Sequence, residues 1–202
     1  MLPDNWITED RSLFLKEHST LIVSDIHFNH EQNQTEDIKS RLEKIVNKFK
    51  PEKLVLNGDT FNSFPFDSSG ITVIKSISTD ISETIILPGN HEEKCGGFTD
   101  EIINEFTVKT EYLVGSNILI HHGHHTPTKK ADVHIIGHIH PAINQDPVYL
   151  YKDNAYYNSS VLVLPTFNRF LNNYDINDYN YSSHCPIISD GISIQEYKYR
   201  TI

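Results

Sequence analysis

Cysteine is almost absent from this sequence. Cys95 and Cys185 are its only two cysteines among 202 residues, and they lie far apart. The chain therefore offers neither a disulfide framework nor a Cys-x-x-Cys zinc motif. Disulfides are rare in the reducing cytosol, and this cysteine usage agrees with a cytoplasmic location.

Long apolar runs are also lacking. No stretch approaches the roughly 20 apolar residues that a membrane-spanning helix needs. The N-terminal sequence MLPDNWITEDRS has neither the basic nor the apolar region of a signal peptide. We therefore expect no membrane association. We expect a single domain over residues 1–202, which is long enough to bury a proper core.

Positive charge is scarce. The chain has 17 Lys and Arg against 27 Asp and Glu, a net charge of −10 with neutral histidines. This balance argues against a broad surface for long nucleic acid. It leaves room for a small phosphorylated substrate, because bound divalent cations would reverse the sign of the potential inside a cleft.

Histidine, in contrast, is abundant. The chain has 12 histidines, and they are concentrated in HHGHHTPTKKADVHIIGHIHP, from His121 to Pro141. Neutral imidazole is the commonest metal ligand in proteins. A histidine beside a glycine at a strand end can point its nitrogen into a cleft while the glycine lets the backbone turn. The stretch predicts a metal site, although a polar loop with incidental histidines is the simpler alternative.

The first half of the chain alternates strands with helices. Apolar runs predict strands at 12–15, 20–23, 53–56 and 84–87. Apolar residues at helical spacing predict helices at 37–49 and 71–81, and a short helix at 99–106. A strand, a helix and a further strand form a βαβ unit.

After Lys109 the pattern changes to short apolar runs separated by turn signals. These runs predict strands at 112–114, 118–120, 133–136, 148–151, 155–157, 161–164 and 192–199. The Asn-, Tyr- and Asp-rich segment 168–181 is expected to be an ordered surface loop.

Polar side chains follow successive strands, at the point where each strand ends. They are Asp25 and His27, Asp59, Asn90 and His91, His122, and His138 with His140. A single such ending is only a weak sign of a site, but five in succession are difficult to explain as incidental polar loops. Ligand sites in open α/β sheets form beyond the carboxyl ends of the strands, so we expect these groups to converge there.

The ligand types indicate which metals and which chemistry to expect. Oxygen and nitrogen ligands without thiolate suit Mn²⁺, Fe²⁺ or Zn²⁺. Seven candidate ligands exceed what one ion needs, whereas two ions about 3.5–4 Å apart that share a carboxylate would use them well. Such a pair clamps a phosphoryl group and lowers the pKa of a bridging water, whose hydroxide attacks phosphorus in line.

The order Asp-x-His, Gly-Asp, Gly-Asn-His, His-Gly, Gly-His-x-His resembles the calcineurin-like metallophosphoesterase superfamily. The flanking segments SLFLKEHSTLIVSDIHFNHE, GHIHPAI and LPTFNRF resemble a narrower group, the small archaeal and bacterial phosphoesterases related to the nuclease subunit SbcD. That group includes proteins encoded beside DNA ligase genes. The implied fold is α+β, a four-layer αββα sandwich of two mixed sheets flanked by helices.

The resemblance also implies roles for the site residues. Asp25, His27 and His140 would hold one metal ion. Asn90, His122 and His138 would hold the other, and Asp59 would bridge the two. His91 would not bind metal, but would act as general acid for the leaving oxygen or stabilise charge on the phosphoryl oxygens. Mn²⁺ is the expected metal, with Fe²⁺ or Zn²⁺ as alternatives.

Two positions depart from the family pattern. Asn29 stands where the family often has glycine, two residues after the first histidine. Asparagine tolerates left-handed backbone geometry, so the turn can survive. Asn62 stands where the second motif often has an aspartate. That residue is usually not a ligand, so the departure concerns contacts to the substrate rather than the metals.

Several residues near the motifs remain open to interpretation. His124 could touch substrate, since many relatives have His-Gly-His at this place. His134 is expected to be packed or hydrogen-bonded inside its strand. Lys129 and Lys130 are the only obvious basic pair near the motifs, and Arg169 could reach a phosphate but is expected to have a surface role.

These observations lead to one predicted function and two alternatives. We expect a two-metal phosphoesterase that hydrolyses a phosphodiester or a phosphomonoester. Its partner would be a small phosphorylated substrate, a nucleotide or a short nucleic-acid end, and the oligomeric state stays open. The alternatives are a nuclease acting on DNA ends and a non-catalytic interaction scaffold on the same fold.

Overall fold

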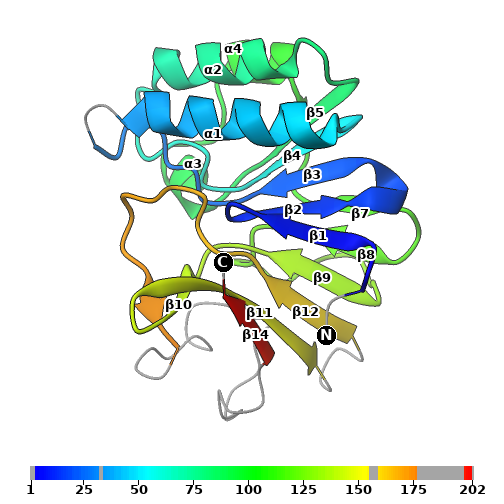
Figure 1. Ribbon diagram of the computed structural model, residues 1–202. Coiled ribbons are helices and arrows are strands. Elements are labelled where there is room, and N and C mark those ends of the chain that lie inside the picture. Colours follow the sequence, from blue (N-terminus) through cyan, green and yellow to red (C-terminus); the bar gives the residue numbers. More distant parts are fainter. Residues whose placement is uncertain (1–2, 32–33, 155–158, 177–197, 202) are drawn as a thin grey trace.

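The structure is a computed structural model that describes residues 3–31, 34–154, 159–176 and 198–201. Two mixed β-sheets pack face to face, and helices cover the outer face of the first sheet (Figure 1). This arrangement confirms the predicted α+β class with two mixed sheets. No helix within the described ranges is long and apolar enough to cross a membrane.

The first sheet has six strands that follow one another in chain order. They are β1 (Trp6–Glu9), β2 (Ser12–Leu15), β3 (Thr20–Val23), β4 (Lys53–Asn57), β5 (Glu83–Leu87) and β6 (Thr107–Val108), with the 3-10 turn η1 (Lys16–His18) between β2 and β3. The first three strands pair antiparallel, and β3 to β6 pair parallel. The parallel strands β3, β4 and β5 therefore end at the same edge of the sheet.

Four helices accompany this sheet: α1 (Gln34–Phe49), α2 (Ser68–Ser78), α3 (Asn90–Lys94) and α4 (Asp100–Glu105). The apolar face predicted for α1 is confirmed, because Ile38, Leu42 and Ile45 are buried against the sheet. Helix α2 begins and ends three residues earlier than predicted. Asp67 caps it by accepting hydrogen bonds from the backbone N–H groups of the next turn, at 3.1 and 3.2 Å.

The second sheet has eight strands, in the order β13-β10-β11-β12-β9-β8-β7 with β14 beside β11. Their bounds are β7 (Tyr112–Val114), β8 (Ile118–Ile120), β9 (Val133–Ile136), β10 (Pro141–Ile143), β11 (Asp146–Asn154), β12 (Ser159–Val163), β13 (Tyr174–Asp175) and β14 (Lys198–Thr201). Strands β8 and β9 are parallel, so their carboxyl ends also share one edge.

Some sequence expectations fail or fall outside the described residues. The prediction of a loop throughout 168–181 is wrong at β13, whose two residues pair with β10. Strands β1, β6 and β10 and the five-residue helix α3 were not predicted, because each has at most two apolar residues beside polar residues or proline. The strand predicted at 155–157, the segment 177–181 and most of the strand predicted at 192–199 lie outside the described residues.

The core follows the alternation of side chains along the strands. Leu13 and Leu15 of β2 join the apolar layer between the two sheets, whereas Phe14 packs with the helices. In the second sheet Leu162 faces that inner layer, and Val161 belongs to a third apolar cluster on the other face. The described layers are thus helix, sheet and sheet. No helix of the described part covers the outer face of the second sheet.

Candidate metal centre

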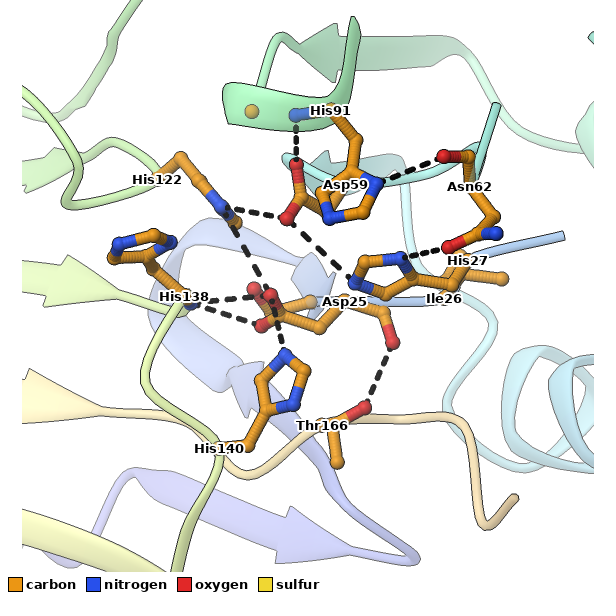
Figure 2. Close-up of polar contacts among 12 residues, drawn as sticks. Asp25, Ile26, His27, Asp59, Asn62, His91, His122, His138, His140 and Thr166 are labelled. Carbon is orange, nitrogen blue, oxygen red and sulfur yellow. Dashed lines mark hydrogen bonds and ion pairs between the residues drawn. The ribbon is translucent and has the colours of Figure 1, made fainter. Parts of the chain in front are cut away.

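All eight predicted site residues lie just beyond the carboxyl ends of five strands. Asp25 and His27 follow β3, Asp59 follows β4, Asn90 and His91 open α3 after β5, His122 follows β8, and His138 and His140 follow β9. Figure 2 shows the carboxylates of Asp25 and Asp59 at the middle of this arrangement, with histidines around them. The structure therefore brings side chains from all five motifs to one edge, and their roles as metal ligands stay predictions.

Seven of the side chains form three overlapping groups. One contains Asp25, His27 and His140, a second contains Asp59, His122 and His138, and a third, of His27, Asp59 and His91, connects the first two; within each group the ligand atoms lie within 4.8 Å of one another. The Nε2 atom of His140 lies 3.1 Å from Asp25 Oδ1. Asp59 Oδ2 lies 3.3 Å from His122 Nε2 and 3.6 Å from His27 Nε2, so this carboxylate faces histidines of the first two groups. That is the position expected of a bridging ligand.

The backbone at these residues adopts an uncommon conformation. The φ angles are positive at Asp25 (56°), His27 (47°), Asp59 (46°), His138 (72°) and His140 (39°). Left-handed geometry costs an L-residue about 1–2 kcal/mol, and such strain concentrates at functional sites. Asn29 also has a positive φ of 69°, which confirms that asparagine adopts the turn for which the family often uses glycine.

Two motif glycines leave room for site residues from neighbouring strands. A Cβ atom on Gly58 would lie 2.2 Å from His122 Nδ1, and one on Gly89 would lie 2.1 Å from Asp59 Oδ1. Both distances are too short for any real contact. The glycines therefore permit the close approach that brings His122 and Asp59 together.

Backbone and amide oxygens orient three of the histidines. Nδ1 of His122 donates to the carbonyl oxygen of Asn57 at 3.0 Å, and Nδ1 of His140 donates to that of Asn172 at 3.2 Å. Nδ1 of His27 lies 3.3 Å from Asn62 Oδ1, which can accept in the same way (Figure 2). A proton held on Nδ1 leaves the Nε2 lone pair facing the carboxylates, as in metal-binding histidines.

The electrostatics of the centre also favour a bound cation. Burial alone would raise the pKa of Asp25, but His140 and His122 outweigh it and lower the pKa to about 2. Burial likewise acts against ionisation of Asp59, yet His122 and His27 hold its pKa well below the usual range. Burial lowers the pKa of His27 to about 4, which keeps this imidazole neutral. Burial would lower the pKa of His122, but Asp59 and Asp25 raise it to about 10, so the two buried carboxylates keep a positive charge beside them. A bound divalent cation would supply that charge instead.

The residues fit a pair of divalent metal ions. His27 Nε2, His122 Nε2 and Asn90 Oδ1 are buried and have no hydrogen-bond partner. Leaving such an atom unsatisfied costs about 1–3 kcal/mol, so buried polar atoms normally have partners. All three belong to the predicted ligand set, and their nitrogen and oxygen atoms suit Mn²⁺, Fe²⁺ or Zn²⁺.

His91 lies in the group with His27 and Asp59, and it is the partly exposed member of that group. Its backbone N–H donates to Asp59 Oδ1 at 2.9 Å, and its Nδ1 donates to the carbonyl oxygen of Asn62 at 2.8 Å. Its ring meets the ring of His27 edge-on, with 4.6 Å between the centroids. Because Nδ1 is occupied by Asn62, Nε2 is the nitrogen that can exchange a proton with a bound molecule.

The structure adds residues that sequence reasoning missed. Glu92 is fully buried and accepts hydrogen bonds from the backbone N–H groups of Asp59 (3.1 Å), Phe61 (2.8 Å) and Gly89 (2.8 Å), so it joins the loops after β4 and β5. Burial, with Asp59 adding, raises the pKa of Glu92 to about 7. Thr166 donates to the carbonyl oxygen of Asp25 at 2.8 Å. Glu92 follows His91 in Gly-Asn-His-Glu, and Thr166 lies in LPTFNRF, so these motif positions were the sequence features that could have indicated a role.

Three of the residues left open in the sequence have partners in the structure. His134 lies in β9 and is hydrogen-bonded to His121 at 3.2 Å, as expected. Arg169 pairs with Asp10 at 2.8 Å, and Lys129 pairs with Glu111 at 3.4 Å. Neither cation is held towards the metal ligands.

The fold and the site together define a metal-binding α+β domain. The chain belongs to the calcineurin-like phosphoesterase family, whose sequence model matches residues 18–177. With that membership and its groups of metal ligands, it is a metal-dependent phosphoric ester hydrolase. The family prediction is thereby confirmed.

Two solved structures show similarity to this chain. The nuclease MPE of Pseudomonas putida is 18% identical and has a TM-score of 0.64, with 85% of this chain and 86% of that chain covered. The protein AQ665 of Aquifex aeolicus is 20% identical with a TM-score of 0.43, over 60% of this chain and 78% of that chain. No curated protein sequence matches the chain.

Proposed function

We propose that this protein is a two-metal phosphodiesterase. The observation that carries the proposal is the position of Asp59, whose Oδ2 atom faces histidines of both ligand groups, at 3.3 Å and 3.6 Å. A carboxylate shared in this way is what two neighbouring ions require. Asp25, His27 and His140 would hold one ion, and Asn90, His122 and His138 the other. Mn²⁺ is the metal we expect.

When bound, two ions would supply a nucleophile at neutral pH by lowering the pKa of a bound water, and they would neutralise charge on the phosphoryl oxygens. The protein fixes the geometry through Asn57, Asn62 and Asn172, which orient the histidine rings. His91 gives a proton to the leaving oxygen, because its Nδ1 is held by Asn62 and its exposed side can reach the substrate.

The charges around the centre favour a diester over a monoester. Three described cations near the motif loops are already paired: Lys129 with Glu111, and both Arg41 and Arg169 with Asp10. A diester carries one negative charge at its phosphate, whereas a monoester carries close to two at neutral pH. With a net charge of −10, the protein needs less compensation to bind the diester.

The test compares hydrolysis of bis-p-nitrophenyl phosphate and p-nitrophenyl phosphate by metal-stripped and Mn²⁺-restored protein. We expect Mn²⁺-dependent turnover, with the higher kcat/KM for the diester. His18→Ala is a matched control, because His18 lies at the other end of β3 from the centre. Its activity should equal that of the wild type. Faster hydrolysis of the monoester would contradict the diester preference, and activity that survives metal removal would contradict the mechanism.

A nuclease is the second candidate, and the specific observation in its favour is the similarity of fold to the nuclease MPE over most of both chains. The flanking likeness to SbcD-related proteins points the same way and stays a prediction. Cleavage of a labelled single-stranded oligonucleotide, compared with cleavage of a dinucleotide, separates the two. Because of the net charge of −10, we expect the dinucleotide to have the higher kcat/KM.

A further inference from the structure

A further group of candidate metal ligands lies outside the predicted centre. Glu93 belongs to α3, and His124 and His125 follow β8. Each offers one ligand atom, and these atoms lie within 4.8 Å of one another. No sequence motif assigned Glu93 or His125 a function.

The contacts within this group resemble those within the metal centre. Glu93 turns one oxygen to each ring: Oε2 is hydrogen-bonded to His125 Nε2 at 2.8 Å, and Oε1 lies 3.1 Å from His124 Nε2. Both ring nitrogens of His124 are nevertheless buried without a hydrogen-bond partner. His122 Nε2 shows the same combination beside Asp59. Glu93 Oε1 and His124 Nε2 thus lie close together without the alignment of a hydrogen bond. This geometry results when the lone pairs of the oxygen and of the nitrogen both point at a third position, where a cation can bind.

The group also has access to the phosphoesterase site. The His124 ring lies 5.2 Å from the His122 ring and 6.0 Å from the His138 ring, measured between centroids. Glu93, His124, His125 and His122 line one pocket of about 230 Å³. The His124 side chain is 11% exposed and that of Glu93 is 41% exposed, so one ligand lies inside the pocket wall and another at its mouth.

We propose that Glu93, His124 and His125 bind a third divalent cation at the margin of the phosphoesterase site. Two imidazoles and one carboxylate form a donor set that suits Zn²⁺ and leaves a coordination position open. An oxygen of a phosphorylated substrate can take that position from the pocket. The substrate contact rests on the proposed function, whereas the binding of the cation does not.

The test counts the Zn²⁺ ions bound per chain, by equilibrium dialysis of metal-free protein against Zn²⁺. Wild type and His18→Ala should each bind three ions, whereas Glu93→Gln and His125→Ala should bind one fewer. His125→Ala is the safer variant for folding, because the side chain of His125 is 68% exposed. A wild-type count of two, or an unchanged count in both variants, would overturn the proposal.

Testing His125→Ala in a protein that already carries Asp59→Asn distinguishes the third cation site from the two-metal centre. Asp59→Asn should weaken binding at the centre, and adding His125→Ala to it should remove one further ion. That result would support the third site even if the protein hydrolysed no phosphodiester. If His125→Ala removed an ion only when Asp59 was intact, the ion would belong to the two-metal centre and the third site would be refuted.

Discussion

The close approach of Gly89 to Asp59 gives the sharpest test of how the loops build the site. Gly89 has an extended backbone with φ −107° and ψ −175°, which alanine can adopt. A Cβ atom there would lie 2.1 Å from Asp59 Oδ1 and 2.4 Å from the Asp59 backbone nitrogen, where ordinary contacts begin at 3.4 Å. Asp59 must therefore move by about 1 Å, and rotation of its side chain cannot relieve the backbone contact.

A displacement of about 1 Å at a reacting centre can cost about 100-fold in rate, or about 2.7 kcal/mol of barrier. We therefore expect Gly89→Ala to lower kcat/KM for the Mn²⁺-dependent hydrolysis of bis-p-nitrophenyl phosphate about 100-fold. The free energy of unfolding, measured with urea, should also fall, because Gly89 N–H donates to Glu92 at 2.8 Å in the same junction.

Gly96 is the matched control. Its φ is +87°, and a Cβ atom there would meet nothing within 4 Å. Gly96→Ala should lose about 1–2 kcal/mol of unfolding free energy from backbone strain and keep the kcat/KM of the wild type. The reasoning is refuted if Gly89→Ala stays within about threefold of the wild type, or if the two variants lose activity equally.

Three further predictions follow from the contacts. His91→Ala should lower diester turnover about 100- to 10,000-fold while the two ions of the centre stay bound, and loss of these ions would assign His91 a structural role instead. Chelation of the ions should lower the free energy of unfolding, by about 2.7 kcal/mol relative to protein in metal at 100 times its Kd, and an unchanged melting temperature would contradict this. Arg41→Met should cost about 2–3 kcal/mol of unfolding free energy, because nearly buried Arg41 pairs with Asp10 at 2.9 Å and Asp10 is itself partly exposed. Burial would raise the pKa of Asp10, but Arg41 and Arg169 lower it below 3.8. Ionised Asp10 therefore stabilises the fold above the unfolded pKa, and this contribution is lost as the pH falls through the lower folded value. Urea unfolding at about pH 6 and about pH 3.5 measures how much unfolding free energy each protein loses on acidification. Arg41→Met should lose less than the wild type, and equal losses would contradict the role given to the pair of Arg41 and Asp10.

The sequence predicted the elements that have strong periodic signals. Helix α1 has apolar residues at regular helical spacing, and β7, β8 and β9 are apolar runs between turns, so their bounds were close or identical. Helix α3 and strand β13 span five and two residues, and their structure depends on contacts with distant parts of the chain. Periodicity within the sequence cannot reveal such elements.

The candidate site was predictable where a side chain of suitable type follows an apolar run. Its supporting contacts were not, because many use the backbone. The carbonyl oxygens of Asn57 and Asn172 orient His122 and His140, and any residue type could supply a carbonyl. Asn62 departs from the family pattern, yet its Oδ1 lies 3.3 Å from His27 Nδ1, so this asparagine supports the metal-facing ring.

The most direct test of the two-metal proposal is a stepwise titration of metal-free protein with Mn²⁺. Bound ions per chain and turnover of bis-p-nitrophenyl phosphate are measured at each step, with Asp59→Asn as the variant that lacks the shared carboxylate. We predict little turnover in chains with one ion, a rise as the second ion binds, and no such rise in Asp59→Asn. Turnover that grows in proportion to the first ion and saturates there, or that survives in Asp59→Asn, would contradict the account.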